Sequence, residues 1–110
     1  MGNPKFVIQR SEEQFHFNLV AGNGEIILTS ERYTRASDAR EGIASVKLSS
    51  TIDARYVRKT SVAAEPYFVL RAGNNEVVGT SEMYSSPGAR DEGIAAVKAN
   101  APGASVEDRT

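Results

Sequence analysis

The chain has 110 residues, the length of a single domain, and this is enough to bury a hydrophobic core without disulfides or metal. It contains no cysteine, which excludes disulfide scaffolds and thiolate catalysis, and its formal net charge of −1 creates no overall field for nucleic acid or anionic lipid. No apolar run approaches the roughly 18 residues of a membrane span, and no signal-peptide segment is visible, so we expect a cytoplasmic protein without membrane contact.

The first half begins with the pattern of antiparallel strands. Apolar and polar side chains alternate over 5–10 and again over 14–21, which is typical of half-buried strands. Asn23-Gly24 tolerates positive φ, so we expect a type I′ turn into a third strand over 25–30. The apolar run 26–28 breaks the alternation, which leaves open either burial on both faces or a β-bulge.

The apolar period then changes to three and four residues. This spacing predicts a helix over 38–48, with Ser37 as its N-cap. Near the end of the chain, Ser86 followed by Pro87 predicts a second helix that extends to about Ala99.

Each predicted helix carries a glycine in its middle, Gly42 in the first and Gly93 in the second. A glycine in a helix interior costs about 1 kcal/mol relative to alanine. We therefore expect a close approach of helix to sheet, or of the two helices, where a methyl group would not fit.

Most of this pattern occurs in two tandem repeats, at an offset of about 51 residues and with about half of the aligned positions identical. The segment 55–60 reads as a strand after the first helix, and 106–110 holds the same place after the second. In 55–60, Tyr56 also stands where Lys5 stands in the first copy. We therefore predict a single domain of two intertwined repeats, about 5–60 and 55–110, that share the strand 55–60.

These elements predict an α+β fold of tandem βββα-β repeats. Three strands, a helix, a strand, two strands, a helix and a strand follow one another along the chain. One mostly antiparallel sheet with both helices packed on one face, related by a pseudo-two-fold axis, buries every apolar stripe at once.

The repeated motifs resemble the YegP-like family of small bacterial proteins. The blocks that carry the resemblance are Ala21-Gly22-Asn23-Gly24-Glu25, Thr29-Ser30-Glu31, 42–47, Ala72-Gly73-Asn74, Thr80-Ser81-Glu82-Met83-Tyr84 and 93–98. The resemblance covers the whole chain and implies a single sheet of two repeats with exchanged C-terminal strands. It implies no established biochemical function and no catalytic residues. The second copy departs from the first at Asn75 in place of Gly24 and at Gly79 in place of Leu28, which concerns turn geometry and one packing contact.

Catalytic and metal chemistry have little support in the composition. His16 is the only histidine, so a metal site would need carboxylates alone. The second copy has Tyr67 at the corresponding position, which favours a solvated histidine on the sheet face over a catalytic one. We expect no catalytic residues, no metal and no cofactor.

Polar residues kept by both copies cluster at the corner between the third strand of each repeat and its helix. They are Ser30, Glu31, Tyr33, Ser81, Glu82 and Tyr84. The favoured interpretation is a hydrogen-bonded scaffold that ties the corner to the helix start. The alternative is a pair of symmetry-related ligand or peptide sites, each with a tyrosine platform and a carboxylate.

A second candidate interaction surface is the open face of the sheet. Arg55, Arg58 and Lys59 form a basic run in one strand, and Tyr67 and His16 add surfaces on which bases could stack. A solvated face of mixed charge is the default interpretation for such residues.

The sequence thus favours a non-enzymatic protein-interaction or structural module that acts through the sheet face or an edge strand, with another protein as partner. The alternative is weak binding of single-stranded nucleic acid through the basic face. A small-molecule enzyme is least favoured, and it would need a pocket that holds Tyr33 or Tyr84 beside Glu31 or Glu82. We expect a monomer, because two fused repeats supply in one chain what a single repeat would obtain from a dimer.

Overall fold

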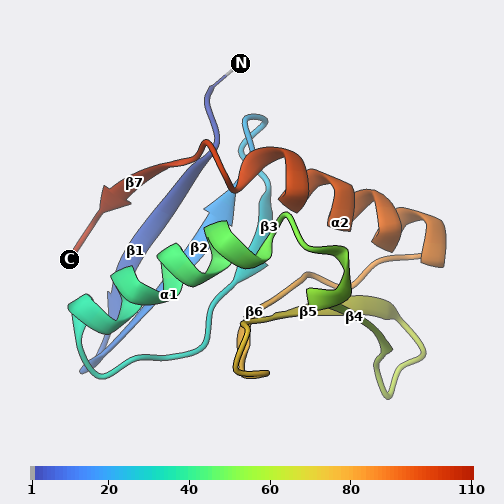
Figure 1. The fold of residues 1–110 in the computed structure, drawn as a ribbon, viewed down its shortest axis with the longest axis horizontal. Helices are drawn as coiled ribbons and strands as arrows, with labels where there is room; N and C mark the ends of the chain where they lie inside the picture. Colours follow the sequence, from blue (N-terminus) through green and yellow to red (C-terminus); the bar gives the residue numbers. More distant parts are fainter. Residues whose placement is uncertain (1) are drawn as a thin grey trace.

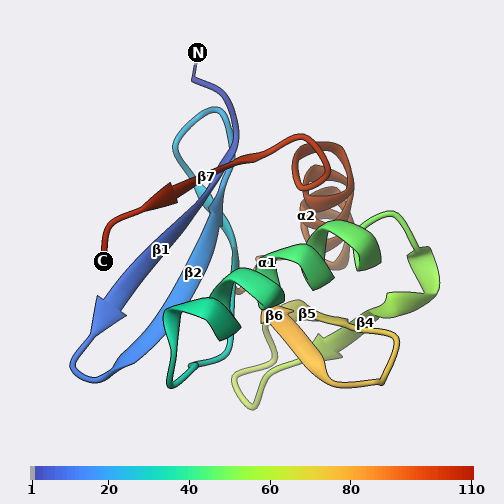
Figure 2. The same cartoon turned by 60° about the vertical axis from the view of Figure 1, so that its left-hand side comes forward.

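The computed structural model describes residues 2–110, and it confirms the predicted α+β architecture (Figure 1). Seven strands form one sheet in the order β4-β5-β6-β3-β2-β1-β7, and two helices cover one face of it (Figures 1 and 2). The elements are β1 (Lys5–Ser11), β2 (Gln14–Val20), β3 (Ile26–Thr29), α1 (Ala36–Ser49), the 3-10 turn η1 (Asp53–Arg55), β4 (Tyr56–Thr60), β5 (Pro66–Arg71), β6 (Val77–Thr80), α2 (Pro87–Asn100) and β7 (Ser105–Asp108). Over these residues every strand pair is antiparallel except β1 with β7, which is parallel.

The hydrophobic core lies between the helices and one face of the sheet. Alternate strand residues such as Phe6, Phe17 and Phe68 are completely buried, and they meet the helix stripes that contain Val46 and Val97. The alternation that marked the strands in the sequence therefore selects which face the helices cover.

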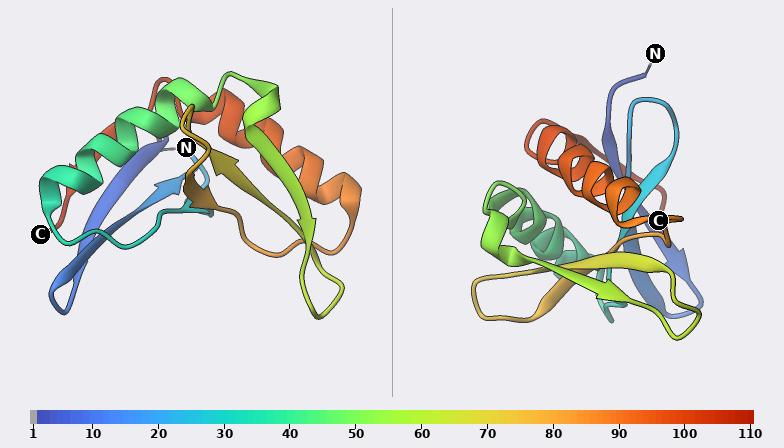
Figure 3. Two further views of the ribbon diagram at one scale, coloured as in Figure 1. Left: turned by 60° about the horizontal axis from the view of Figure 1, so that its bottom comes forward. Right: turned by 90° about the vertical axis from the view of Figure 1, so that its right-hand side faces the viewer.

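In the middle of the sheet the two repeats meet between β3 and β6, where Thr29 lies opposite Thr80. On either side of this pair the half-sheets diverge, as the two splayed hairpins in Figure 3 (left) show. At the same junction Leu28 packs against Gly79, where an added Cβ would lie 2.6 Å from the leucine Cγ. The repeats cannot both carry leucine here, because one leucine already fills the space near the pseudo-two-fold axis.

The turns between β2 and β3 and between β5 and β6 differ from the predicted type I′ turn. Only Gly24 has positive φ in the first turn, at +88°, and the amide of Ala21 donates to the Glu25 carbonyl across a three-residue loop. Asn23 instead accepts the Glu25 amide through its side chain, at 3.0 Å. Asn75 adopts φ +73° in the second copy, so the substitution of asparagine for glycine preserves the turn.

The apolar run 26–28 of the third strand is explained by a β-bulge. The pairing of β2 with β3 shifts its register between Leu19 and Val20. Strict alternation would place Ile27 and Leu28 on opposite faces, but the bulge lets both join the core. The same shift recurs between Leu70 and Arg71 in the second copy.

The predicted N-cap residue is confirmed for α2 but not for α1. The Ser86 side chain accepts the amide of Ala89 at 3.0 Å, as predicted. The prediction of Ser37 as a cap is wrong, because α1 begins earlier and Arg35 occupies the N-cap position without a side-chain cap. The Arg35 guanidinium instead pairs with Asp38 in the first turn, at 3.1 Å.

β4 is the structural counterpart of β1, at an offset one residue shorter than predicted. Phe6 lies edge to face on Phe17 with ring centroids 5.7 Å apart, and Tyr56 lies on Phe68 in the same way, also at 5.7 Å. Tyr56 therefore corresponds to Phe6 and not to Lys5, because the β4–β5 loop is longer than the β1–β2 loop. The chain end behaves as the resemblance implied, since β7 leaves the second repeat and pairs with β1 of the first.

Candidate functional site

The corner serines are built into the sheet. The Ser30 hydroxyl accepts the amide of Phe17 at 2.8 Å and donates to the carbonyl of Glu31 at 2.7 Å. Ser81 repeats both bonds with Phe68 and Glu82, at 2.9 and 2.8 Å. Each serine thus replaces a backbone partner at the point where the third strand of its repeat ends, which agrees with the scaffold interpretation for these two residues.

The corner tyrosines lie beneath the helix glycines. Tyr33 stacks on Phe17 with ring centroids 6.4 Å apart, and a Cβ added at Gly42 would lie 2.9 Å from the tyrosine Cζ. In the second repeat Tyr84 lies under Gly93, where the corresponding distance is 2.5 Å. The expected close approach at the glycines is therefore made mainly by a tyrosine ring of the corner.

Burial raises the pKa of the Tyr33 hydroxyl, and the nearby carboxylates of Glu31, Asp38 and Glu76 raise it further. Burial also raises the pKa of Tyr84, with smaller effects from Glu82 and Glu25. Both hydroxyls therefore stay protonated at neutral pH and can donate hydrogen bonds.

A cavity of about 440 Å³ opens beside Tyr33, between α1 with its preceding corner and the β5–β6 hairpin. The lining comes from both repeats, since the corner and α1 belong to the first and the β5–β6 hairpin to the second. The lining residues are Arg32, Tyr33, Thr34, Asp38, Glu41, Gly42, Ser45, Ala72, Asn74, Glu76 and Val78. Acidic side chains outnumber basic ones in this lining, and Asp38 is already paired with Arg35.

A second cavity of about 340 Å³ adjoins the first along α1. The two share Ser45 and Ala72, and the second is lined further by Leu48, Ile52 and other residues of the same side. Leu48 is 76% exposed and Ile52 is 41% exposed, so this end presents apolar surface to solvent. We call the two adjoining cavities the α1 groove.

The sequence found part of this groove. Tyr33 was a candidate because both copies keep it, and Glu41, Asn74 and Glu76 also recur in both copies, a signal that could have identified them. Leu48 gave no such signal, because its exposure depends on how α1 rests on the sheet.

The second corner is less polar than the first. Met83 stands in place of Arg32, and Ala89 stands in place of Asp38. The carboxylates of Glu31 and Glu82 help to raise the pKa of the neighbouring hydroxyls, those of Tyr33 and Tyr84 respectively. Glu31 does not line the cavity beside Tyr33, so the pocket that an enzyme would have needed, with tyrosine and this glutamate together, does not form there.

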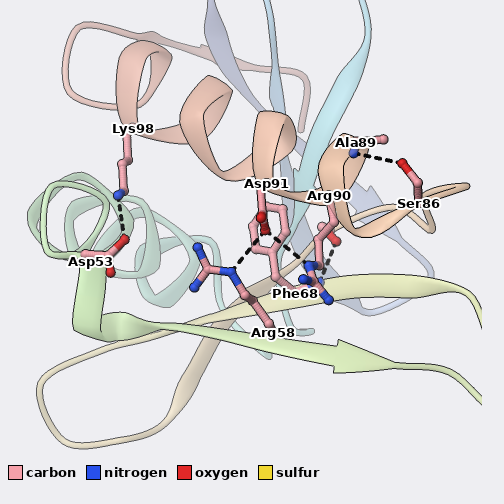
Figure 4. Close-up of polar contacts among 9 residues, drawn as sticks. Asp53, Arg58, Phe68, Ser86, Ala89, Arg90, Asp91 and Lys98 are labelled. Carbon is pink, nitrogen blue, oxygen red and sulfur yellow. Dashed lines mark hydrogen bonds and ion pairs between the residues drawn. The ribbon is translucent and has the colours of Figure 1, made fainter.

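The predicted basic surface is divided between different parts of the molecule. Arg58 lies opposite Phe68 in the β4–β5 register and therefore shares its helix-covered face, where it pairs with Asp91 of α2 at 3.0 Å (Figure 4). Arg55 lies in η1 and lines the α1 groove. The placement of all three basic residues on the open face is therefore wrong, since consecutive strand residues alternate between faces and only Lys59 points to the open side.

The aromatic candidates do lie on the open face. Tyr67 is opposite Lys59, and His16 is opposite Gln9. Burial lowers the pKa of His16, and the charge of Arg32 lowers it further. His16 lies on the sheet face as predicted, but it is only partly exposed and its Nδ1 is buried, so the ring is less solvated than expected.

Residues 2–110 contain no group of three or more histidine, cysteine or acidic side chains arranged to hold a metal ion. Neither helix in this part of the chain has the length and apolar character needed to cross a membrane.

Comparisons with known proteins agree with the duplicated fold. A family model described as "Domain of unknown function (DUF1508)" matches residues 11–56 and again residues 61–108. The chain is 55% identical over 105 residues to a UPF0339 protein of Bordetella pertussis, and the match covers 96% of this chain and 95% of that protein. It is 48% identical over 100 residues to the UPF0339 protein YegP of Escherichia coli K12, with 91% of each chain covered.

Two solved structures share the fold over nearly the whole chain. The solution NMR structure of a UPF0339 protein from Shewanella oneidensis has a TM-score of 0.90 at 46% identity, covering 96% of this chain and 91% of that one. The solution NMR structure of YegP from E. coli, titled a protein of unknown function, has a TM-score of 0.93 at 44% identity, covering 100% and 96%. The resemblance noted in the repeated motifs is confirmed: the chain belongs to the bacterial UPF0339 family that includes YegP.

Proposed function

We propose that this protein is a non-enzymatic interaction module that binds an extended segment of another protein in the α1 groove. The observation that carries the proposal is that the two cavities adjoin at Ser45 and Ala72, which places a polar site around Tyr33 next to the exposed apolar side chains of Leu48 and Ile52. A groove with a polar end and an apolar end suits a peptide better than a compact metabolite.

The two ends define the chemistry of the bound segment. Glu41 and Glu76 would attract a lysine or arginine, and the protonated Tyr33 hydroxyl would donate to a peptide carbonyl. Leu48 and Ile52 would pack against an apolar side chain at the other end. α1 rises roughly 15 Å between Asp38 and Leu48 at about 1.5 Å per residue, which an extended segment spans with about five residues.

The same geometry argues against catalysis at this site. A tyrosine whose pKa is raised is less often ionised at neutral pH and so is rarely present as the nucleophilic phenolate, and the lining of the cavity contains no histidine or lysine that would activate it. We therefore propose binding without covalent chemistry.

Selection from a random heptapeptide display library tests the proposal. We expect the enriched peptides to carry a basic residue about four positions from a large apolar one. Leu48→Glu and Glu41→Lys should each lower their affinity about tenfold, since one removes apolar contact and the other reverses a charge. Val62→Glu is the matched control, because Val62 is at least as exposed as Leu48 but lies in the β4–β5 loop outside the groove. Peptides that bind both groove variants as tightly as the original protein, or a selection without enrichment, would contradict this function.

Weak single-stranded nucleic-acid binding remains the second candidate. The open face carries Lys59, Arg71 and Lys5, and Arg109 lines a shallow cavity of about 340 Å³ on the same side. Glu107 offsets part of this charge through its ion pairs with Lys5 and Arg109. An NMR titration with short DNA and RNA strands at low and moderate salt would favour this candidate if shifts at Lys59 and Arg71 appeared and faded as salt rose.

A further inference from the structure

The outer edge of β4 lacks the covering strand that its counterpart has. β7 covers the outer edge of β1, with Phe6 beside Val106 and Ile8 beside Asp108 in a parallel pairing. Among residues 2–110, β4 pairs with β5 alone and forms one edge of the sheet (Figure 1). The two halves of the molecule therefore differ by one strand.

The helices confirm that β4 and β1 occupy equivalent environments. Lys47 of α1 lies over the Phe6 ring at 5.9 Å, and Lys98 of α2 lies over the Tyr56 ring at 5.5 Å. The Lys98 ammonium also donates to Asp53 at 2.7 Å, at the entry to β4 (Figure 4). The lysine contacts beside β7 on one side thus recur on the other, although Asp91 of α2 stands where Arg40 of α1 holds Asp108.

The backbone of β4 presents unpaired groups at this edge. Phe68 of β5 exchanges its amide and carbonyl with Ser81 on the β6 side, so these groups do not face β4. Arg58 lies opposite Phe68 and is therefore at a non-hydrogen-bonded position, where its own amide and carbonyl point outward. On β1 the equivalent carbonyl, that of Ile8, accepts the amide of Arg109 at 2.9 Å.

The charge at this edge indicates what could pair with it. Arg58 and Lys59 are adjacent and exposed on β4, and Arg55 immediately precedes the strand. The Arg58 guanidinium already pairs with Asp91 through Nε, so an acidic residue of a partner would share it with Asp91. Pairing between two copies through β4 would bring these cations together, which is unfavourable for directly opposed residues. β7 has the opposite character, with Glu107 and Asp108 at its end.

We propose that the β4 edge, Tyr56–Thr60, binds an extended acidic segment of another protein as an added parallel strand, in the manner in which β7 lies on β1. In that register the residue in the place of Glu107 would lie beside Val57, and the acidic residue in the place of Asp108 would lie beside Arg58. The protein's own β7 is not free for this role, because Glu107 is held by Lys5 at 3.0 Å and Asp108 by Arg40 at 2.6 Å. Backbone hydrogen bonds would supply affinity and the paired charges would supply selectivity.

A synthetic peptide with the sequence of residues 103–110 serves as the probe, and the same peptide with both acidic residues replaced by lysine serves as its control. In an NMR titration of the labelled full-length protein, we expect the acidic peptide to shift the amides of Arg58 and Thr60, which point outward, more than those of Val57 and Lys59. The amide of Arg58 should also become at least tenfold slower in hydrogen exchange. A spin label at the N-terminus of the peptide should broaden residues at the start of β4, as a parallel strand requires. Equal binding of the lysine peptide, or broadening at Thr60 instead, would overturn the proposal.

Two variants distinguish binding at the β4 edge from binding in the α1 groove and from self-association. Arg58→Pro removes an outward amide, which an edge strand tolerates, together with the guanidinium that pairs with Asp91, and should abolish peptide binding. Should that variant fail to fold, the double change Arg58→Glu and Lys59→Glu should weaken binding about tenfold or more, and unchanged affinity would refute the assignment. Leu48→Glu in the α1 groove should leave this binding intact, so the two sites can fail independently. Peptide-independent dimerisation that Arg58→Pro disrupts would show that a second copy, and not an acidic partner, occupies the edge.

Discussion

Gly42 of α1 lies directly over the Tyr33 ring, so that a Cβ at this position would come within 2.9 Å of the tyrosine Cζ. Alanine would gain about 1 kcal/mol in helix propensity. The overlap with a ring already stacked on Phe17 costs about 1–3 kcal/mol, so we expect Gly42→Ala to destabilise the fold on balance. Urea denaturation measures the change.

Gly88 provides the matched control for this substitution, since its nearest contact for an added Cβ is the Ser86 hydroxyl at 3.9 Å. Gly88→Ala should stabilise the protein by roughly 0.5–1 kcal/mol. If Gly42→Ala stabilised the protein as much as Gly88→Ala, the tyrosine contact would not be the reason for the glycine.

Leu28 and Gly79 form a coupled pair at the junction of the repeats. Gly79→Ala should destabilise the fold by about 1–3 kcal/mol, because the new Cβ would lie 2.6 Å from Leu28. Leu28→Ala should cost about 2–5 kcal/mol through the cavity it leaves. The double variant should lose less than the sum of the two, as a double-mutant cycle by chemical denaturation would reveal. Additive losses would mean that the two side-chain positions are not packed against each other.

The corner serines should be equally important in both repeats. Ser30→Ala and Ser81→Ala each remove the acceptor of a strand amide, which costs about 1–3 kcal/mol when the amide is shielded from water. Ser61→Ala is the control, because its hydroxyl accepts amides of an exposed loop that water can replace. A loss for Ser61→Ala as large as for the corner variants would argue that shielding is not what makes the corners sensitive.

Tyr56 should make stability fall at alkaline pH. Its hydroxyl donates to the Ser50 carbonyl at 2.8 Å, and burial raises the pKa of this phenol well above its ordinary value, with Asp53 adding to the shift. The folded state therefore disfavours the tyrosinate, and the stabilisation is complete below about pH 10 and is lost as pH rises further. Tyr56→Phe should cost about 0.5–1.5 kcal/mol at neutral pH and reduce the decline above pH 10, measured by urea denaturation across that range. An unchanged alkaline decline in Tyr56→Phe would assign it to other groups.

Truncation after Thr60 tests whether β4 serves both repeats. The shortened chain would lose β5, the partner of β4, and also β7, which covers β1. We expect it to be unfolded or to self-associate through its bare sheet edges. Circular dichroism and size-exclusion chromatography distinguish these outcomes from a stable monomeric half, which would refute the prediction of intertwined repeats.

The order of strands and helices, the duplication and the helix-covered face could all be read from the sequence. These features follow from local periodicity: alternation of two marks strands such as β2, and the three-and-four spacing around Ile43 marks α1. The resemblance of the repeated blocks to a known family then indicated the arrangement of the sheet. The predicted correspondence between the repeats was wrong by one residue at β4, because the loop before β5 is longer and an alignment of the repeats does not give the register of a strand pair.

Only the tertiary structure decided what surrounds each side chain. Sequence showed that Gly42 and Tyr33 recur in both copies, but their contact depends on how the corner folds beneath α1. It likewise could not place Arg58 against Asp91, since that pair joins residues far apart in the chain. The α1 groove and the bare β4 edge arise where two repeats meet or where one strand has no counterpart. Such features are determined by long-range packing, whereas the pattern along the chain encodes only which local structure each segment prefers.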